Sequence, residues 1–86
     1  MNMDNVRIDK WLWAARFFKT RSLAAKAVSG GHVALNGHKI KPARTMQVGD
    51  LLVIRQGFFE VTLRVLALSE QRGPAVVACT LYQETE

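Results

Sequence analysis

The sequence has 86 residues, 49% of them hydrophobic and 22% charged, with a formal net charge of +5 at pH 7. Its length allows one small domain spanning residues 1–86, its single cysteine excludes a disulfide framework and a cysteine metal cluster, and no apolar run approaches the roughly 18 residues of a membrane span. Residues 1–6 also lack an apolar stretch of the signal-peptide type, so we expect a cytoplasmic protein with no membrane partner.

The first predicted element is a helix over about residues 8–18. At helical spacing its apolar side chains fall on one side, which is expected to face the core: Ile8, Trp11, Leu12, Ala15 and Phe18. The other side mixes cations with aromatic rings: Asp9, Lys10, Trp13, Arg16 and Phe17. Such a mixture is typical of surfaces that bind RNA or single-stranded nucleic acid, although burial of Trp13 against later strands is the alternative.

A break over residues 19–22 separates this helix from a second one, which is predicted to run to about Ser29. The hydroxyl of Thr20 is expected to cap its start, and Gly30-Gly31 to end it, because glycine accepts the left-handed conformation at little cost. Its buried stripe is predicted to be Leu23, Ala24, Ala27 and Val28.

Short strands are predicted in the remainder of the chain. Asn36-Gly37 between residues 32–35 and 38–41 indicates a type I′ hairpin. Further predicted elements are a turn over 48–50, a strand over 51–55 and an alternating strand from Phe59 with Phe59, Val61, Leu63 and Val65 on one face. They are followed by a polar loop over 69–74, a β-rich run over 75–82 and a frayed tail over 83–86. The expected architecture is α+β, with two N-terminal helices packed on a small antiparallel sheet.

Positive charge is concentrated in the first half of the chain. Residues 1–45 hold nine basic and two acidic side chains, against three basic and five acidic in residues 46–86. With a sequence pI near 10.0, this clustering is typical of a nucleic-acid-binding protein. A merely basic domain with no such partner is the alternative.

Several short motifs also follow one another in a characteristic order. They are the basic Ile-Asp-Lys helix from Arg7, the Thr-Arg-Ser restart from Thr20, Gly30-Gly31, the Val-x-Leu-Asn-Gly hairpin from Val33, Lys41-Pro42 and the Val-Gly-Asp turn from Val48. No single motif is specific, but their order and spacing over about residues 7–54 resembles the S4 RNA-binding domain family. Within it, the run from Arg7 to Ser22 is most similar to the ribosome-associated heat shock protein fifteen family, and residues 55–82 read as supporting strands.

The resemblance implies a bacterial protein that binds ribosomal RNA on the large ribosomal subunit. It implies action during heat stress on free large subunits that still carry peptidyl-tRNA, which the protein helps to recycle. Members of this family continue into a basic helical C-terminal extension, whereas this sequence ends at Glu84-Thr85-Glu86, so no function of that extension carries over. Two other functions stay open: an RNA-targeting adaptor for a separate RNA-modifying enzyme, and a protein–protein adaptor that docks through Trp13 and Phe17.

The expected RNA surface centres on the start of the second helix, where the outward amides near Arg21 and Ser22 and the helix dipole form an anion site. The resemblance assigns motif roles to Arg7, Asp9, Thr20, Arg21 and Ser22. A carboxylate cannot pair with phosphate, so Asp9 is expected to orient Arg16 or a junction amide, while Lys26 and Lys39 are alternatively ordinary solvated lysines. The full set of predicted RNA-binding residues is Arg7, Asp9, Lys10, Arg16, Lys19, Thr20, Arg21, Ser22, Lys26, Lys39, Lys41 and Arg44.

No catalytic pattern is present in the sequence, so we expect a binding module without a cofactor and not an enzyme. His32 and His38 have no cysteine or carboxylate constellation beside them, and no metal site is expected. Cys79 lies in an apolar run and is expected to be a small buried hydrophobe. The expected partners are ribosomal RNA, the large subunit and peptidyl-tRNA, with non-specific DNA binding as a further possibility, and the chain is expected to be a monomer.

Overall fold

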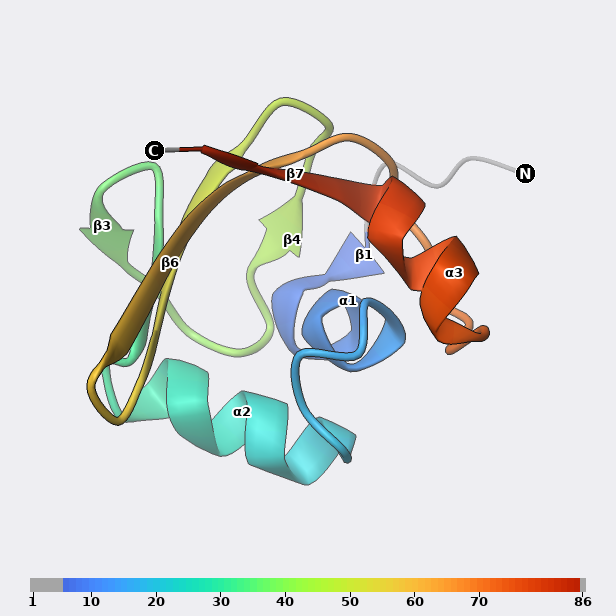
Figure 1. Ribbon diagram of the computed structural model, residues 1–86. Helices are drawn as coiled ribbons and strands as arrows, with labels where there is room; N and C mark the ends of the chain where they lie inside the picture. The colour runs from blue at the N-terminus through green and yellow to red at the C-terminus, as the bar shows by residue number, and fades with distance from the viewer. Residues whose placement is uncertain (1–5, 86) are drawn as a thin grey trace.

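A computed structural model describes residues 6–85, which form helices and two antiparallel sheets (Figure 1). Sheet order is β3-β2-β5-β6-β7 in the larger sheet and β1-β4 in the smaller one. The elements are β1 (Val6–Arg7), α1 (Ile8–Ala14), α2 (Arg21–Ser29), β2 (Val33–Leu35), β3 (His38–Lys39), β4 (Thr45–Met46), β5 (Leu51–Gln56), β6 (Phe59–Val65), α3 (Ala75–Ala78), the 3₁₀ turn η1 (Cys79–Leu81) and β7 (Tyr82–Thr85). The predicted α+β class is confirmed.

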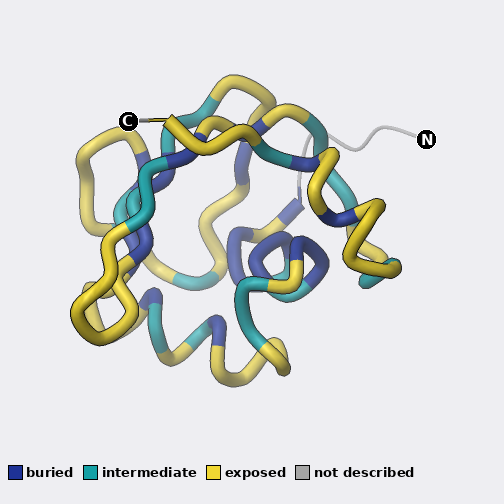
Figure 2. Tube along the Cα trace, in the orientation of Figure 1, coloured by how far each residue is buried: buried dark blue, intermediate teal, exposed yellow. Residues whose placement is uncertain are grey.

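Helix α1 lies in the middle of the molecule, and Figure 2 shows most of its trace as buried. Trp11 is fully buried, and its indole Nε1 donates a hydrogen bond of 2.9 Å to the carbonyl oxygen of Ala67. Leu12 and Ile8 fill the space between α1 and the sheet, where they join a core that includes Leu52 and Leu63. The core stripe predicted for this helix is therefore largely correct.

The first helix ends four residues earlier than predicted. Arg16 takes the left-handed conformation at φ 66°, its N–H donates to Trp13, and the N–H of Phe17 donates to Leu12. These are the two hydrogen bonds of a Schellman motif, which is usually built on glycine. An arginine in this conformation costs about 1 kcal/mol relative to glycine, so the sequence did not mark the end of the helix.

The early turn also corrects the predicted charged face of α1. Phe17 lies against Trp11 and Tyr82, with ring centroids 6.2 Å and 4.7 Å away, and does not share a face with the cations. Trp13 is half-buried, and Asp9 is buried with only 4% of its surface exposed. The mixed face of aromatic and charged side chains inferred from helical spacing is therefore absent as such from the described part of the chain.

Helix α2 begins and ends as predicted. The Thr20 hydroxyl accepts a hydrogen bond from the N–H of Leu23 at 3.1 Å, and Gly31 is left-handed at φ 81° after the last turn. Only Ala24 and Val28 of the predicted stripe are fully buried. Leu23 is 48% exposed, because the first turn of α2 projects past the edge of α1, so its predicted burial is wrong.

Two turns of the strand region are joined by side chains. Asn36 and Gly37 both have positive φ, 52° and 84°, which confirms the type I′ turn. The amide group of Asn36 donates to Asp50 at 3.2 Å and accepts from the N–H of Leu51 at 2.9 Å, while Asp50 accepts from the N–H of Gln47 at 2.8 Å. The β2–β3 hairpin and the turn before β5 are thus held as one unit.

The C-terminal part departs most from prediction. Residues 75–81 form α3 and η1 instead of a β-rich run, because Pro74 starts a helical turn in which its carbonyl oxygen accepts from Val77 and Ala78. Cys79 is exposed, so its predicted burial is wrong. Residues 82–85 pair with β6 as β7 and are not a frayed tail, whereas residue 86 lies outside the described residues. Residues 1–5, where no apolar stretch of the signal-peptide type is predicted, also lie outside the described residues.

Candidate nucleic-acid interface

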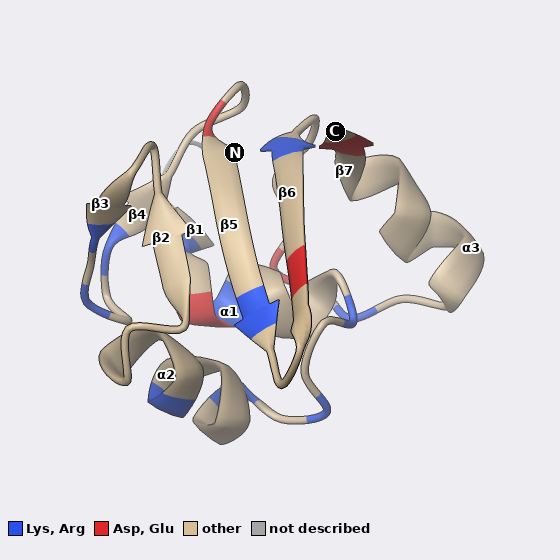
Figure 3. Ribbon diagram, turned by 60° about the vertical axis from the view of Figure 1, so that its left-hand side comes forward, with Lys and Arg blue, Asp and Glu red and all other residues tan. Residues whose placement is uncertain are grey.

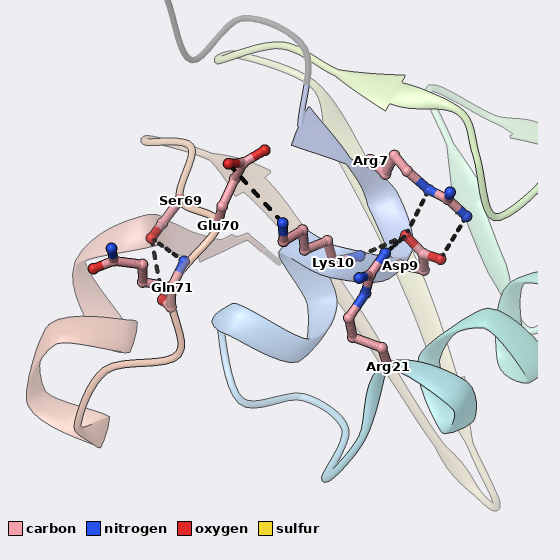
Figure 4. A network of polar contacts seen from close by, with 7 residues as sticks. All are labelled: Arg7, Asp9, Lys10, Arg21, Ser69, Glu70 and Gln71. Atoms are coloured by element: carbon pink, nitrogen blue, oxygen red, sulfur yellow. Dashed lines mark hydrogen bonds and ion pairs between the residues drawn. The ribbon is translucent and has the colours of Figure 1, made fainter. Parts of the chain in front are cut away.

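A buried carboxylate organises two arginines at the meeting point of β1, α1 and α2 (Figure 4). Asp9 accepts from Arg7 through both oxygens, at 3.2 Å from Nε and 2.9 Å from Nη2, and from the N–H of Lys10 at 2.7 Å. Arg21 Nη2 stands 3.8 Å from the same carboxylate. Asp9 therefore orients Arg7 and Arg21, and no contact with Arg16 is found in the described residues; the amide it accepts from belongs to Lys10 in α1 and not to the junction between the helices.

Asp9 leaves both arginines available to a ligand. Its side chain is 6% exposed, whereas those of Arg7 and Arg21 are 48% and 44% exposed. A guanidinium group has five N–H donors, so donors of both arginines face solvent after the pairing. The carboxylate thus holds Arg7 by hydrogen bonds and Arg21 by an ion pair, with both side chains still partly exposed.

The first turn of α2 places unpaired amides beside these arginines. The hydroxyl oxygen of Thr20 accepts a hydrogen bond from the N–H of Leu23, and its carbonyl oxygen accepts one from the N–H of Ala24. Within residues 6–85, no hydrogen bond from the N–H groups of Arg21 and Ser22 is found. The first turn of a helix carries partial positive charge, and Lys19 precedes it as an exposed side chain, so this end of α2 suits a phosphate.

The segment after β3 brings further cations to the same side. The N–H groups of Ile8 and Asp9 donate to the carbonyl oxygens of Arg44 and Pro42, at 2.8 Å and 3.4 Å, which places residues 41–44 against the start of α1. Figure 3 shows basic segments on α2, on the connection that precedes it, and on and after β3. The predicted residues at or near this meeting point are Arg7, Lys19, Thr20, Arg21, Ser22, Lys41 and Arg44, with Asp9 buried beneath them, whereas Lys26 lies further along α2 and Lys39 lies on β3.

Two predicted site residues belong to another surface. Lys10 lies 4.0 Å from Glu70, and Arg16 donates to the carbonyl oxygen of Gly73 at 2.8 Å. Arg72, which the sequence analysis did not select, donates from the same loop to the carbonyl oxygen of Trp13 at 3.1 Å. The side chains of Lys10 and Arg16 therefore contact residues 69–73, although the backbone N–H of Lys10 is bonded to Asp9, the partner of Arg21.

The described residues contain no group of three or more His, Cys, Asp and Glu side chains able to hold a metal ion. His32 and His38 are both exposed. No helix within residues 6–85 is long and apolar enough to cross a bilayer. The arrangement combines cations, hydroxyls and free amides, which bind anions and do not by themselves perform a reaction.

Comparison with known proteins identifies the region that holds this arrangement. A family model described as the S4 domain matches residues 6–52. The chain is 53% identical to the heat shock protein 15 homolog of Aeromonas salmonicida and 51% identical to heat shock protein 15 of Escherichia coli K12, over 94% and 93% of its length. It spans only 61% and 60% of those relatives.

Two further matches come from a more distant relative and a solved structure. The RQC P-site tRNA stabilizing factor of Listeria monocytogenes is 38% identical over 76% of this chain and 71% of the relative. The trimeric structure of Vibrio cholerae heat shock protein 15 superimposes with a TM-score of 0.92 at 49% identity, covering 94% of this chain and 82% of that one.

Proposed function

Given that this chain belongs to the S4 domain family and, within it, to the heat shock protein 15 family, we propose that it binds ribosomal RNA of the large ribosomal subunit. The proposed setting is the recycling, during heat stress, of large subunits that still carry peptidyl-tRNA. The similarity to a P-site tRNA stabilizing factor supports that setting. The proposal is for a binding protein and includes no catalytic step.

The observation that carries the proposal is the Asp9-centred pair of arginines beside the free amides of α2. An RNA phosphate placed at these amides would meet Arg21 and the exposed side chain of Lys19. Arg7 would contact a neighbouring phosphate through the guanidinium donors that Asp9 does not use. Since the arginines are already held by Asp9, little side-chain freedom is lost on binding.

The proposed RNA-contacting set is narrower than the one predicted from sequence. It keeps Arg7, Lys19, Thr20, Arg21 and Ser22 at the centre, with Lys26, Lys39, Lys41 and Arg44 extending the positive field, and gives Asp9 a positioning role. Lys10 and Arg16 are left out because their side-chain contacts lie with residues 69–73. Phosphate contacts of this kind position a protein on RNA without reading its sequence.

The test is co-sedimentation with purified large ribosomal subunits, with and without peptidyl-tRNA, at a series of salt concentrations. Lys19→Gln and Arg21→Gln should each weaken binding and lower the salt dependence of the affinity by about one unit in a logarithmic plot. The neutral Arg21→Gln is chosen because a glutamate there would stand beside Asp9 and unsettle the fold. Arg64→Gln on β6 is the matched control and should bind like the parent protein. Equal affinities and slopes for all four proteins would contradict the proposed site.

The same preparation addresses two partner predictions. Competition with duplex DNA of equal length measures how far the proposed non-specific DNA binding extends. Sedimentation velocity distinguishes the predicted monomer from a trimer like that of the Vibrio cholerae relative.

A further inference from the structure

The turn between β5 and β6 carries two aromatic rings in solvent. Phe58 is 106% exposed and Phe59 is 76% exposed. Among the other large hydrophobic residues of the described part of the chain, only Val76, also at 76%, is as exposed as Phe59. Figure 2 shows this turn as exposed along its length. Alternation puts Phe59 on one face with the buried Leu63 and Val65, yet its ring is exposed, because β6 extends past the core at this end.

The turn does not need these rings. Gln56 pairs with Phe59 across the hairpin, and Gly57, at φ 63°, is its first central residue. A glycine with positive φ at that position, followed by a residue that lacks it, fits a type II′ turn. The second position accepts many residue types, so local backbone geometry gives no reason for an aromatic side chain at position 58.

The hairpin that carries the exposed rings contacts the connection that leads to the proposed phosphate site. Gln56 shares a sheet face with its partner Phe59, and its amide Nε2 donates to the carbonyl oxygen of Phe17 at 3.2 Å. Phe17 starts the short connection that contains Lys19 and Thr20 and leads into α2. The base of the hairpin is also fixed at its other side, where the N–H of Arg55 donates to His32 at 2.8 Å. In Figure 1 the hairpin tip lies at the end of α2 that leads into β2, while Gln56 ties the hairpin to the connection that precedes α2.

We propose that Phe58 and Phe59 form a stacking site for one or two unpaired bases of the RNA whose backbone lies along the start of α2. The inference rests on the proposed function and adds the class of ligand, namely RNA with unstacked bases and not a continuous duplex. Flat rings beside a positively charged strand path are the usual means by which proteins hold single-stranded or bulged nucleotides. Such contacts are tolerant of base identity, because every base has a stacking face.

A second copy of the chain fits this surface less well. Two phenylalanine rings bury at most roughly 500 Å² of this chain's surface, which is below the roughly 600 Å² per partner that corresponds to a total of about 1,200 Å² in the smallest stable interfaces. Nearby surface charge also opposes self-association, because the neighbouring α2 would bring a like-charged surface to the contact. A base needs only one ring face and is attracted by the same charge.

The experiment compares the parent chain with the double variant Phe58→Ser, Phe59→Thr, and with Phe58→Trp. Both substituted positions are exposed, and threonine suits a strand, so the double variant should keep the parent's unfolding midpoint. The probes are large ribosomal subunits and two labelled RNAs of equal length, one a perfect hairpin stem and one with two unpaired adenines in the stem. We expect the double variant to lose on the order of tenfold in affinity for the RNA with unpaired bases, an unchanged salt dependence, and near-parent binding of the perfect stem. Phe58→Trp should retain or exceed the parent affinity.

The possible outcomes separate this inference from the proposed function. Failure of the folded parent chain to bind either RNA or the subunits overturns the proposed function and, with it, the stacking site. Normal binding of all probes by the double variant overturns the stacking site alone. An altered sedimentation coefficient of the double variant, with unchanged RNA affinity, would also overturn it and assign the rings to contacts between copies of the chain.

Discussion

Replacing Asp9 with asparagine should destabilise the protein by about 1–2 kcal/mol. An amide of the same size can keep the bond from the N–H of Lys10, but its NH₂ group then faces Nη2 of Arg7, which now donates to Oδ2 at 2.9 Å. One charge-assisted hydrogen bond is replaced by two opposed donors, which is a loss of about 1.5–3 kcal/mol when the groups cannot move. Because the Arg7 side chain is 48% exposed and can turn towards water, the lower part of that range applies.

The measurement is urea unfolding followed by tryptophan fluorescence, which reports on the buried Trp11. In a chain of 86 residues the predicted loss corresponds to a fall of roughly 5–15 °C in the melting temperature. Glu60→Gln is the matched control, since its carboxylate accepts from Arg55 at 3.3 Å with the two side chains 55% and 68% exposed. That exposed pair should contribute less than about 0.5 kcal/mol. If the two variants lose the same free energy, Asp9 is not the organising group described above.

Three further predictions concern the elements that carry the site. Thr20→Ala should lower the free energy of unfolding by about 1 kcal/mol in the same assay, because it removes the acceptor for Leu23, whereas Ser22→Ala should leave it unchanged. Trp11→Phe should cost about 2 kcal/mol through a cavity and an unpaired Ala67 carbonyl; a cost below about 0.5 kcal/mol would contradict the packing. Partial burial, aided by Cys79 and Glu84, raises the pKa of Tyr82, the single tyrosine, above its ordinary value of 10.0, so tyrosinate absorbance in the folded chain should appear above that pH. The contribution of Tyr82 to the free energy of unfolding should accordingly be fully present below pH 10.0 and be lost as pH rises through the pKa of Tyr82 in the folded chain. Tyr82→Phe should remove this loss.

Local signals in the sequence predicted the elements whose causes are local. Asn36-Gly37 and the Thr20 cap depend on a few neighbouring residues, and both have the predicted geometry. Residues 75–81 were mistaken for a strand because valine, alanine and leucine without periodicity are compatible with either structure. The two-residue strands β1 and β4 were missed, because Val6 pairs with Met46 and no nearby residue indicates that contact.

The site shows the same division between local and distant causes. The sequence marks the start of the second helix clearly, and this allowed the prediction of Lys19, Arg21 and the free amides of α2 as site groups. The partners of Asp9 did not follow, since Arg21 reaches it only through the turn at Arg16. The contact between Lys10 and Glu70 was not predicted, because Glu70 is 60 positions away in the sequence.

The link between Asn36 and Asp50 bears on how such chains diverge in evolution. The two side chains bond to each other and to the backbone beside them. Selection for folding alone would maintain them, whatever the molecule binds. No ion pair or side-chain hydrogen bond of Lys19 or Lys26 is found within residues 6–85, so these exposed residues can be exchanged without unfolding the chain. Descendants that have changed their ligand should therefore still be found through Asn36 and Asp50, and would differ first at positions such as Lys19 and Lys26.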